Sequence, residues 1–177
     1  MYLYFLPTTS SFVSDIEGSK EAVIPNPTHD GGLEHTAARF LPPATWLEMA
    51  TSKEIILFPP QFFLLKMISQ FLVPTAPNSP PGILERQRKQ LRQFLKSGSG
   101  SDPPWADVCI SPVALMGGKY GDGRSILSLE KPGLDLEKLG RRGIKDYVVM
   151  VAFSKEGPRE VEVRLRKDVL GPEKEKL

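Results

Sequence analysis

The order of apolar and polar positions predicts two strands and a long loop at the start of this 177-residue chain. Residues 2–6 and 34–40 are short runs rich in aliphatic, aromatic or β-branched side chains, as is typical of strands. Residues 7–32 between them are largely polar and rich in Ser, Asp, Gly and Pro. Loops of this length are usually functional or disordered, so a long surface loop is expected here.

Three segments with helical spacing follow. Residues 43–50 begin at a proline, which suits the first turn of a helix. The side chains expected to face inward there are Trp46, Leu47 and Met49. Residues 60–72 repeat apolar positions every four residues and predict a mostly buried helix. Residues 82–96 have a polar centre and apolar ends, which predicts a partly exposed helix.

The last third of the chain has the two-residue period of strands. Residues 108–110 and 125–129 are apolar runs on either side of a predicted turn at Asp122-Gly123. Residues 147–153 are strongly apolar, and residues 160–165 alternate strictly between charged and apolar side chains. This pair predicts an antiparallel hairpin with one face in water.

The residue types that carry catalysis are sparse and scattered. The two histidines, His29 and His35, lie six positions apart without further clustered ligands, so no metal site is predicted. Gly117-Gly118 lacks the strand–glycine–helix context of a phosphate loop and is interpreted as a turn. Cys109 stands in an apolar run with no histidine nearby in sequence, which favours a buried, unreactive thiol.

Composition narrows the class of protein. A formal net charge of +2 gives no basic surface of the kind that nucleic acid requires. No stretch approaches the ~18 apolar residues of a membrane span. A single cysteine fits a reducing compartment, so an intracellular protein is expected, cytoplasmic by default, with peroxisome and mitochondrion left open. The oligomeric state is not specified.

A glycine, serine and proline-rich segment at residues 97–104 (SGSGSDPP) is the clearest linker. It divides the chain into residues 1–96 and residues 105–177. The second part is expected to be a β-rich C-terminal extension, so the fold class predicted for the chain is α+β.

Two adjoining segments carry a resemblance to a known family. Residues 33–47 (LEHTAARFLPPATWL) and residues 55–65 (IILFPPQFFLL) look like the strand, helix and Leu-x-Pro-Pro-Gln-Phe signature late in Nudix hydrolases of the coenzyme A diphosphatase type. The resemblance covers roughly residues 1–72 well and residues 105–170 weakly. It implies a partial Nudix-like domain over residues 1–96, an incomplete α/β/α sandwich.

The Nudix box itself, G-x5-E-x7-R-E-U-x-E-E-x-G-U with U aliphatic, is absent from the sequence. In the family its glutamates bind divalent cations that neutralise a diphosphate and activate water. The nearest match begins at Arg159-Glu160 but has Val163 and Arg164 where the paired glutamates belong, and its period of two indicates a strand. The chain therefore looks like the second half of such a protein, truncated just after the active-site helix.

The resemblance implies cleavage of diphosphates in nucleoside-diphosphate derivatives such as (acyl-)coenzyme A, with Mg²⁺ or Mn²⁺ in the full-length family. For this chain alone we expect no catalytic residue, no metal ligand and no cofactor. Position alone suggests Pro59, Pro60 and Gln61 as substrate-binding residues, for a nucleotide or coenzyme A-type ligand. The alternatives left open are a non-catalytic binding or interaction module and an unstable product with an exposed sheet edge.

Overall fold

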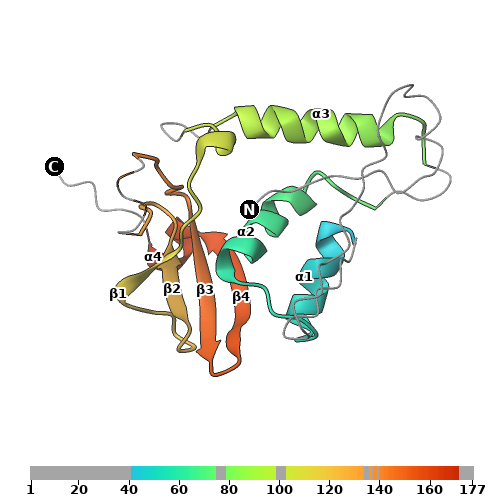
Figure 1. Cartoon of the computed structure of the whole chain (residues 1–177). Helices are drawn as coiled ribbons and strands as arrows, with labels where there is room; N and C mark the ends of the chain where they lie inside the picture. Colours follow the sequence, from blue (N-terminus) through green and yellow to red (C-terminus); the bar gives the residue numbers. More distant parts are fainter. Residues whose placement is uncertain are drawn as a thin grey trace, which may run out of the picture. The chain divides into compact units, whose positions relative to one another are not determined.

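The computed structural model describes residues 41–74, 79–98, 103–133 and 140–171, together with residues 136 and 138. The strands predicted at residues 2–6 and 34–40, and the loop between them, lie outside the described residues. The described part combines helices with one antiparallel sheet, which confirms the predicted α+β class (Figure 1).

Two helices open the described part, as predicted. Helix α1, Pro43–Thr51, starts with proline in its first turn, where the missing N–H costs no helical hydrogen bond. Helix α2, Pro59–Ser69, starts in the same way and buries one stripe of its surface. The buried side chains of α2 are Pro59, Phe62, Phe63, Met67 and Ile68. The two helices pack against each other and against the last strand of the sheet.

Helix α3, Ile83–Lys96, confirms the third prediction. It begins after Gly82, whose φ of 79° lies in the left-handed region that glycine reaches without strain. Its polar centre is mostly exposed, but Gln87 is buried and its Nε2 donates a hydrogen bond of 2.9 Å to the Val73 carbonyl oxygen. The short 3₁₀ helix η2, Trp105–Asp107, packs against α3.

Four strands follow in simple antiparallel order. They are β1 (Val113–Lys119), β2 (Ser125–Ser128), β3 (Tyr147–Ser154) and β4 (Gly157–Leu165), and the short helix α4 (Arg166–Leu170) closes the described chain. The predicted hairpin of residues 147–153 and 160–165 is confirmed as β3 and β4, with Val149 opposite Val163 and Met150 opposite Glu162.

Three local predictions in this region were wrong. Residues 108–110 form no strand, and the partner of β2 is β1 instead. Gly117-Gly118 lies within β1, where the register shifts between Ala114 and Lys119 and Gly117 has φ 70°. A glycine with positive φ lets the strand bulge, so the pair bends a strand instead of ending one. Cys109 is half-buried, not fully buried.

The two faces of the sheet have separate cores. On one face, Phe63 and Met67 of α2 pack against side chains of the sheet and against Ile144. These sheet side chains are Leu127, Leu129, Val149 and Val151, with Val161 and Val163 at the margin. On the other face, Ile126, Val148 and Met150 pack with Leu115, Tyr120 and Val169.

The first core joins side chains from both sides of the predicted linker at residues 97–104. Phe63 precedes the linker and is fully buried, and Trp105 follows it with its ring stacked 6.2 Å from that of Phe63, centroid to centroid. The division of the chain at residues 97–104 stays a prediction. Phe63 and Trp105, on either side of these residues, belong to one core.

In the part of the chain that the structure describes, no helix combines the length and the apolar character that crossing a membrane requires.

Candidate functional site

A concave surface lies along β4, the last strand of the described sheet. Helices α1 and α2 stand beside this strand (Figure 1), and a cavity of about 440 Å³ opens between them and β4. We call it the β4 groove. A cavity of this size is within the range of pockets that hold small ligands, ~300–1,000 Å³.

One wall of the β4 groove is apolar. Its side chains come from α1, the segment after it, α2 and β4: Ala50, Ile55, Leu57, Phe62, Val161 and Val163. Phe62 is buried, whereas Val161 and Val163 are half-buried at the margin of the core. Beyond the irregular position at Glu160, β4 alternates regularly, so Val161 and Val163 pack on the α2 side of the sheet while Glu162 and Arg164 face the other way.

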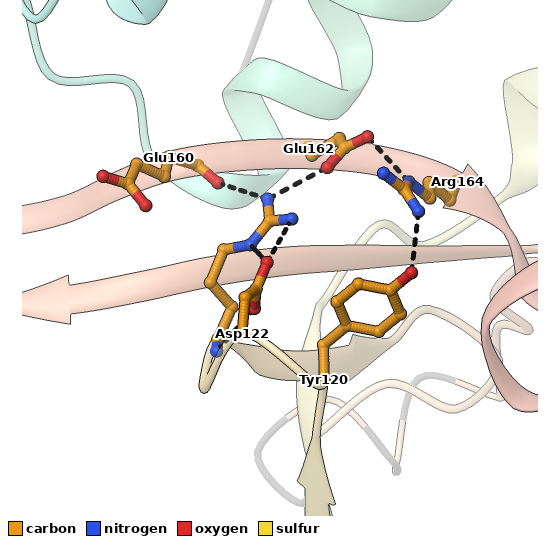
Figure 2. A network of polar contacts seen from close by, with 6 residues as sticks. Tyr120, Asp122, Glu160, Glu162 and Arg164 are labelled. Carbon is orange, nitrogen blue, oxygen red and sulfur yellow. Dashed lines mark hydrogen bonds and ion pairs between the residues drawn. The ribbon is translucent and has the colours of Figure 1, made fainter.

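The polar part of the groove's lining centres on Arg124, which stands just before β2. Its side chain is 13% exposed, and the guanidinium reaches across to β4. Nη2 lies 2.8 Å from Asp122 Oδ2, and Nη1 lies 3.0 Å from Glu162 Oε2. Nη1 also donates to the Glu160 carbonyl oxygen at 3.1 Å (Figure 2). An arginine side chain with so little exposure needs such partners, because burying an unpaired charge is costly.

The network continues to a second arginine (Figure 2). Arg164 Nε donates to Glu162 Oε1 at 2.7 Å, and its Nη1 donates to the Tyr120 hydroxyl at 3.0 Å. The guanidinium carbons of Arg164 and Arg124 lie 5.4 Å and 6.0 Å from the centroid of the Tyr120 ring. Both distances are within reach of a cation–π attraction.

These contacts lower the pKa of both carboxylates, Asp122 and Glu162. The backbone N–H of Arg124, followed by its side chain, holds the pKa of Asp122 below the ordinary value of 3.8. Burial raises the pKa of Glu162, but hydrogen bonds from Arg164 and Arg124 outweigh it, so the pKa lies below the ordinary 4.5. Both groups are therefore carboxylates at neutral pH, which disfavours a general-acid role for either.

Glu160 gives β4 an irregular course beside the groove. Its φ of 51° is unusual for a residue with a side chain, and the β3–β4 register shifts between Met150 and Ala152. The strand therefore carries a β-bulge at this point. The Arg124 bond to the Glu160 carbonyl oxygen holds the bulge in place, and Lys53 Nζ lies 3.6 Å from Glu160 Oε1.

Two cations stand at the rim of the groove. Lys66 of α2 is exposed, and no carboxylate of the described residues forms an ion pair with it. Arg159 Nη2 lies 2.9 Å from Glu156 Oε2, and that glutamate side chain is 77% exposed. An exposed pair of this kind contributes little and is readily exchanged. Lys66 is the cation of the rim most available to an anionic ligand.

The residues suggested from sequence position, Pro59, Pro60 and Gln61, form the first turn of α2. Pro59 is buried, and Gln61 Oε1 accepts a hydrogen bond from the Phe58 N–H at 3.0 Å. The Gln61 side chain therefore caps the N-terminus of α2. The β4 groove begins at the next residue, Phe62. A substrate-binding role for the three residues stays a prediction.

A Mg²⁺ or Mn²⁺ site does not fit the carboxylates of the groove. Asp122 and Glu162 share Arg124, so a metal ion would have to displace a guanidinium that already neutralises both. Among the residues that the structure describes, no three His, Cys, Asp or Glu side chains gather closely enough to hold a metal ion.

The chain was compared with family models, curated proteins and solved structures. No family model matches the chain, and neither the curated proteins nor the solved structures contain a match.

Reasoning from sequence found β4 and its charged face but missed Arg124, Tyr120 and the groove. The contacts of Arg124 with Glu160 and of Arg164 with Tyr120 join residues 36 and 44 positions apart. The available signal was the alternation of residues 160–165, whose charged face needs partners if it is half-buried. It does not say which residues supply them.

Proposed function

We propose that this chain is a non-catalytic binding or interaction module and that the β4 groove is its binding surface. The observation that carries the proposal is the state of the groove's charged side chains. Glu162 and Asp122 are held by arginines, while Lys66 at the rim has no partner among the described residues. Such a surface is suited to holding a partner or ligand, whereas catalysis by a carboxylate needs one that is free to exchange a proton or bind a metal.

The resemblance to Nudix hydrolases of the coenzyme A diphosphatase type remains a proposal beside this one. It carries with it the incomplete α/β/α sandwich, the intracellular location and a nucleotide or coenzyme A-type ligand. If that ligand is correct, its anionic groups would meet Lys66 and its apolar parts the wall formed by Ile55, Leu57 and Phe62.

One experiment separates the module from a hydrolase. The purified chain is incubated with coenzyme A and with ADP-ribose, each with Mg²⁺ and with Mn²⁺, and products are quantified by chromatography. We expect no diphosphate cleavage above a protein-free control. Turnover that scales with protein concentration and disappears on chelation of the metal would contradict the proposal.

Ligand binding is tested in the same preparations by calorimetry. If coenzyme A or ADP binds in the groove, Lys66→Ala should weaken binding by roughly threefold to tenfold, the effect of one rim charge. Lys89→Ala is the matched control, because Lys89 is an exposed lysine on α3 that does not line the groove. Equal weakening by both substitutions would place the ligand elsewhere.

A further inference from the structure

The outer edge of β4 has hydrogen-bonding groups that the sheet does not use. Within the described residues β4 is the last strand of the sheet, and no strand pairs with its other side. The Arg166 N–H donates to the Asp146 carbonyl oxygen at 2.8 Å, which makes these two residues a hydrogen-bonded pair in register with the β3–β4 ladder. Hydrogen-bonded pairs recur every second residue in an antiparallel ladder. The backbone groups of Glu162 and Arg164 therefore point to β3.

By the same alternation, the N–H and C=O groups of Val161, Val163 and Leu165 point away from β3. Val161 and Val163 also line the β4 groove, the cavity between this strand and helices α1 and α2. Leu165 is 37% exposed, and the side chains of Glu162 and Arg164 are 36% and 38% exposed. This stretch is an edge at which another extended strand can be added.

The sequence of this edge, Val161-Glu162-Val163-Arg164-Leu165, is complementary to itself when a second copy runs antiparallel. With Val163 opposite Val163, each glutamate lies opposite an arginine and each Val161 lies opposite a Leu165. Opposite charges and apolar pairs facing each other across two strands are favourable, whereas like charges are unfavourable.

Two neighbouring registers would use the same outward-pointing N–H and C=O groups, but within residues 161–165 they do not pair opposite charges. Shifting one copy by two residues in either direction places Glu162 opposite Glu162 or Arg164 opposite Arg164. Only the register centred on Val163 combines opposite charges with outward-pointing backbone groups at Val161, Val163 and Leu165. The pattern therefore selects one alignment and a two-fold axis, as in most homodimers.

We infer that the occupant of the β4 edge is a second copy of this chain, joined by antiparallel β4–β4 pairing about a two-fold axis at Val163. The inference rests on the proposed role of the β4 groove as an interaction surface. Each copy contributes five paired residues, which makes a short interface. We expect a dissociation constant on the order of micromolar, as for small, transient interfaces.

The first test is the mass of the full chain in solution by light scattering, from about 1 to about 500 μM protein, a range that brackets such a constant. The expected result is a rise with concentration toward twice 19.7 kDa. Val163→Pro removes one outward N–H at an edge, where proline is tolerated, and should weaken the dimer at least about tenfold. Val163→Thr keeps the N–H and is the control that should dimerise.

A second test reads the register and does not depend on a substitution that interrupts hydrogen bonding. In a Cys109→Ser background, Val163→Cys should form a disulfide-linked dimer under mild oxidation, because paired Cα atoms lie about 5.5 Å apart. Val113→Cys, on the opposite edge strand of the described sheet and 39% exposed, should not. Faster linkage through Val113→Cys would overturn the assigned edge.

A monomeric mass at every concentration would overturn the inference, whether another part of the chain or a different partner then covers the edge. That outcome would leave the proposed function standing, because the proposed function is contradicted by metal-dependent diphosphate cleavage and not by the mass.

Discussion

At the scale of single residues, Arg124 has the most consequences for the candidate site. Its guanidinium joins the turn before β2 to β4 through Asp122, Glu162 and the Glu160 carbonyl oxygen. Hydrogen bonds between a guanidinium and carboxylates are about twice as strong as neutral ones, and their geometry is fixed. This one side chain therefore both contacts the bulge of β4 and neutralises carboxylates beside the groove.

The Glu162 carboxylate is expected to make stability depend on pH. Its pKa is lower in the folded chain than the ordinary 4.5, so its contribution is present above that pH and is lost as the pH falls through the folded value. Urea unfolding between pH ~7 and pH ~3 measures this. The free energy by which the wild type exceeds Glu162→Gln should shrink on acidification.

The free energy by which the wild type exceeds Asp122→Asn should also shrink on acidification, because the pKa of Asp122 is lowered from the ordinary 3.8. A constant difference between wild type and both variants across this range would mean that the arginine contacts contribute nothing in solution.

At the scale of elements, the helices were predictable because their causes are local. Proline in the first turn and the apolar stripe at Phe63 and Met67 lie within one short segment. The hairpin of β3 and β4 followed in the same way from alternation and a turn. Strand β1 was missed because Gly117-Gly118 is typical of a turn, whereas pairing with β2 keeps it in a bulged strand.

The start of α2 provides a test of local stabilisation. Gln61→Ala removes the acceptor for the Phe58 N–H and should lower the free energy of unfolding by about 0.5–1 kcal/mol, as for other helix caps. Urea unfolding measures the change. Gln70→Ala, at the exposed far end of the same helix, is the control and should differ from wild type by less. Equal effects would show that the Gln61 contact is not what stabilises the helix start.

A close approach of two backbone segments makes Gly143 irreplaceable. A Cβ at this position would lie 1.8 Å from the Leu129 carbonyl oxygen, in the stretch where Ile144 N–H donates to that oxygen at 2.8 Å. Gly143→Ala should therefore cost more than roughly 3 kcal/mol of stability, since backbone must move to relieve the overlap.

Thermal unfolding followed by circular dichroism measures the effect of Gly143→Ala. Gly121→Ala is the matched control, because a Cβ there meets nothing within 4 Å. A fully folded Gly143→Ala variant with the wild-type midpoint would contradict this packing.

At the scale of the whole molecule, the larger of the two cores, on the α2 face of the sheet, joins helices and strands of the described chain. Phe63 contacts Trp105 and Tyr147 in an aromatic cluster, with ring centroids 6.2 Å and 5.8 Å away. Helix α3 joins the cluster through Phe94, whose ring lies 4.6 Å from Trp105. Elements from both sides of residues 97–104 thus bury the same apolar surface.

This arrangement predicts cooperative unfolding. Trp46 in α1 and Trp105 in η2 lie on opposite sides of the predicted linker, and fluorescence of Trp46→Phe and Trp105→Phe isolates each one. The free energy of unfolding of the two variants should fall with the same slope against urea concentration. For each variant, the transition followed by far-ultraviolet circular dichroism should coincide with the one followed by fluorescence. Separate transitions would instead favour the division into residues 1–96 and 105–177.

The sequence by itself determined the α+β class, the three helices from α1 to α3 and the hairpin of β3 and β4. Each of these follows from the spacing of apolar residues within a dozen or so positions, because helix and strand periods are local properties of the backbone. It also determined which residues of β4 are charged and which are apolar.

Only the tertiary structure decided what those charged residues do. The Arg124 network, the groove beside Val161 and Val163, and the core shared across residues 97–104 all join segments far apart in the chain. Such contacts depend on how elements pack and on which buried charges find partners, and neither is written in the period of any one segment.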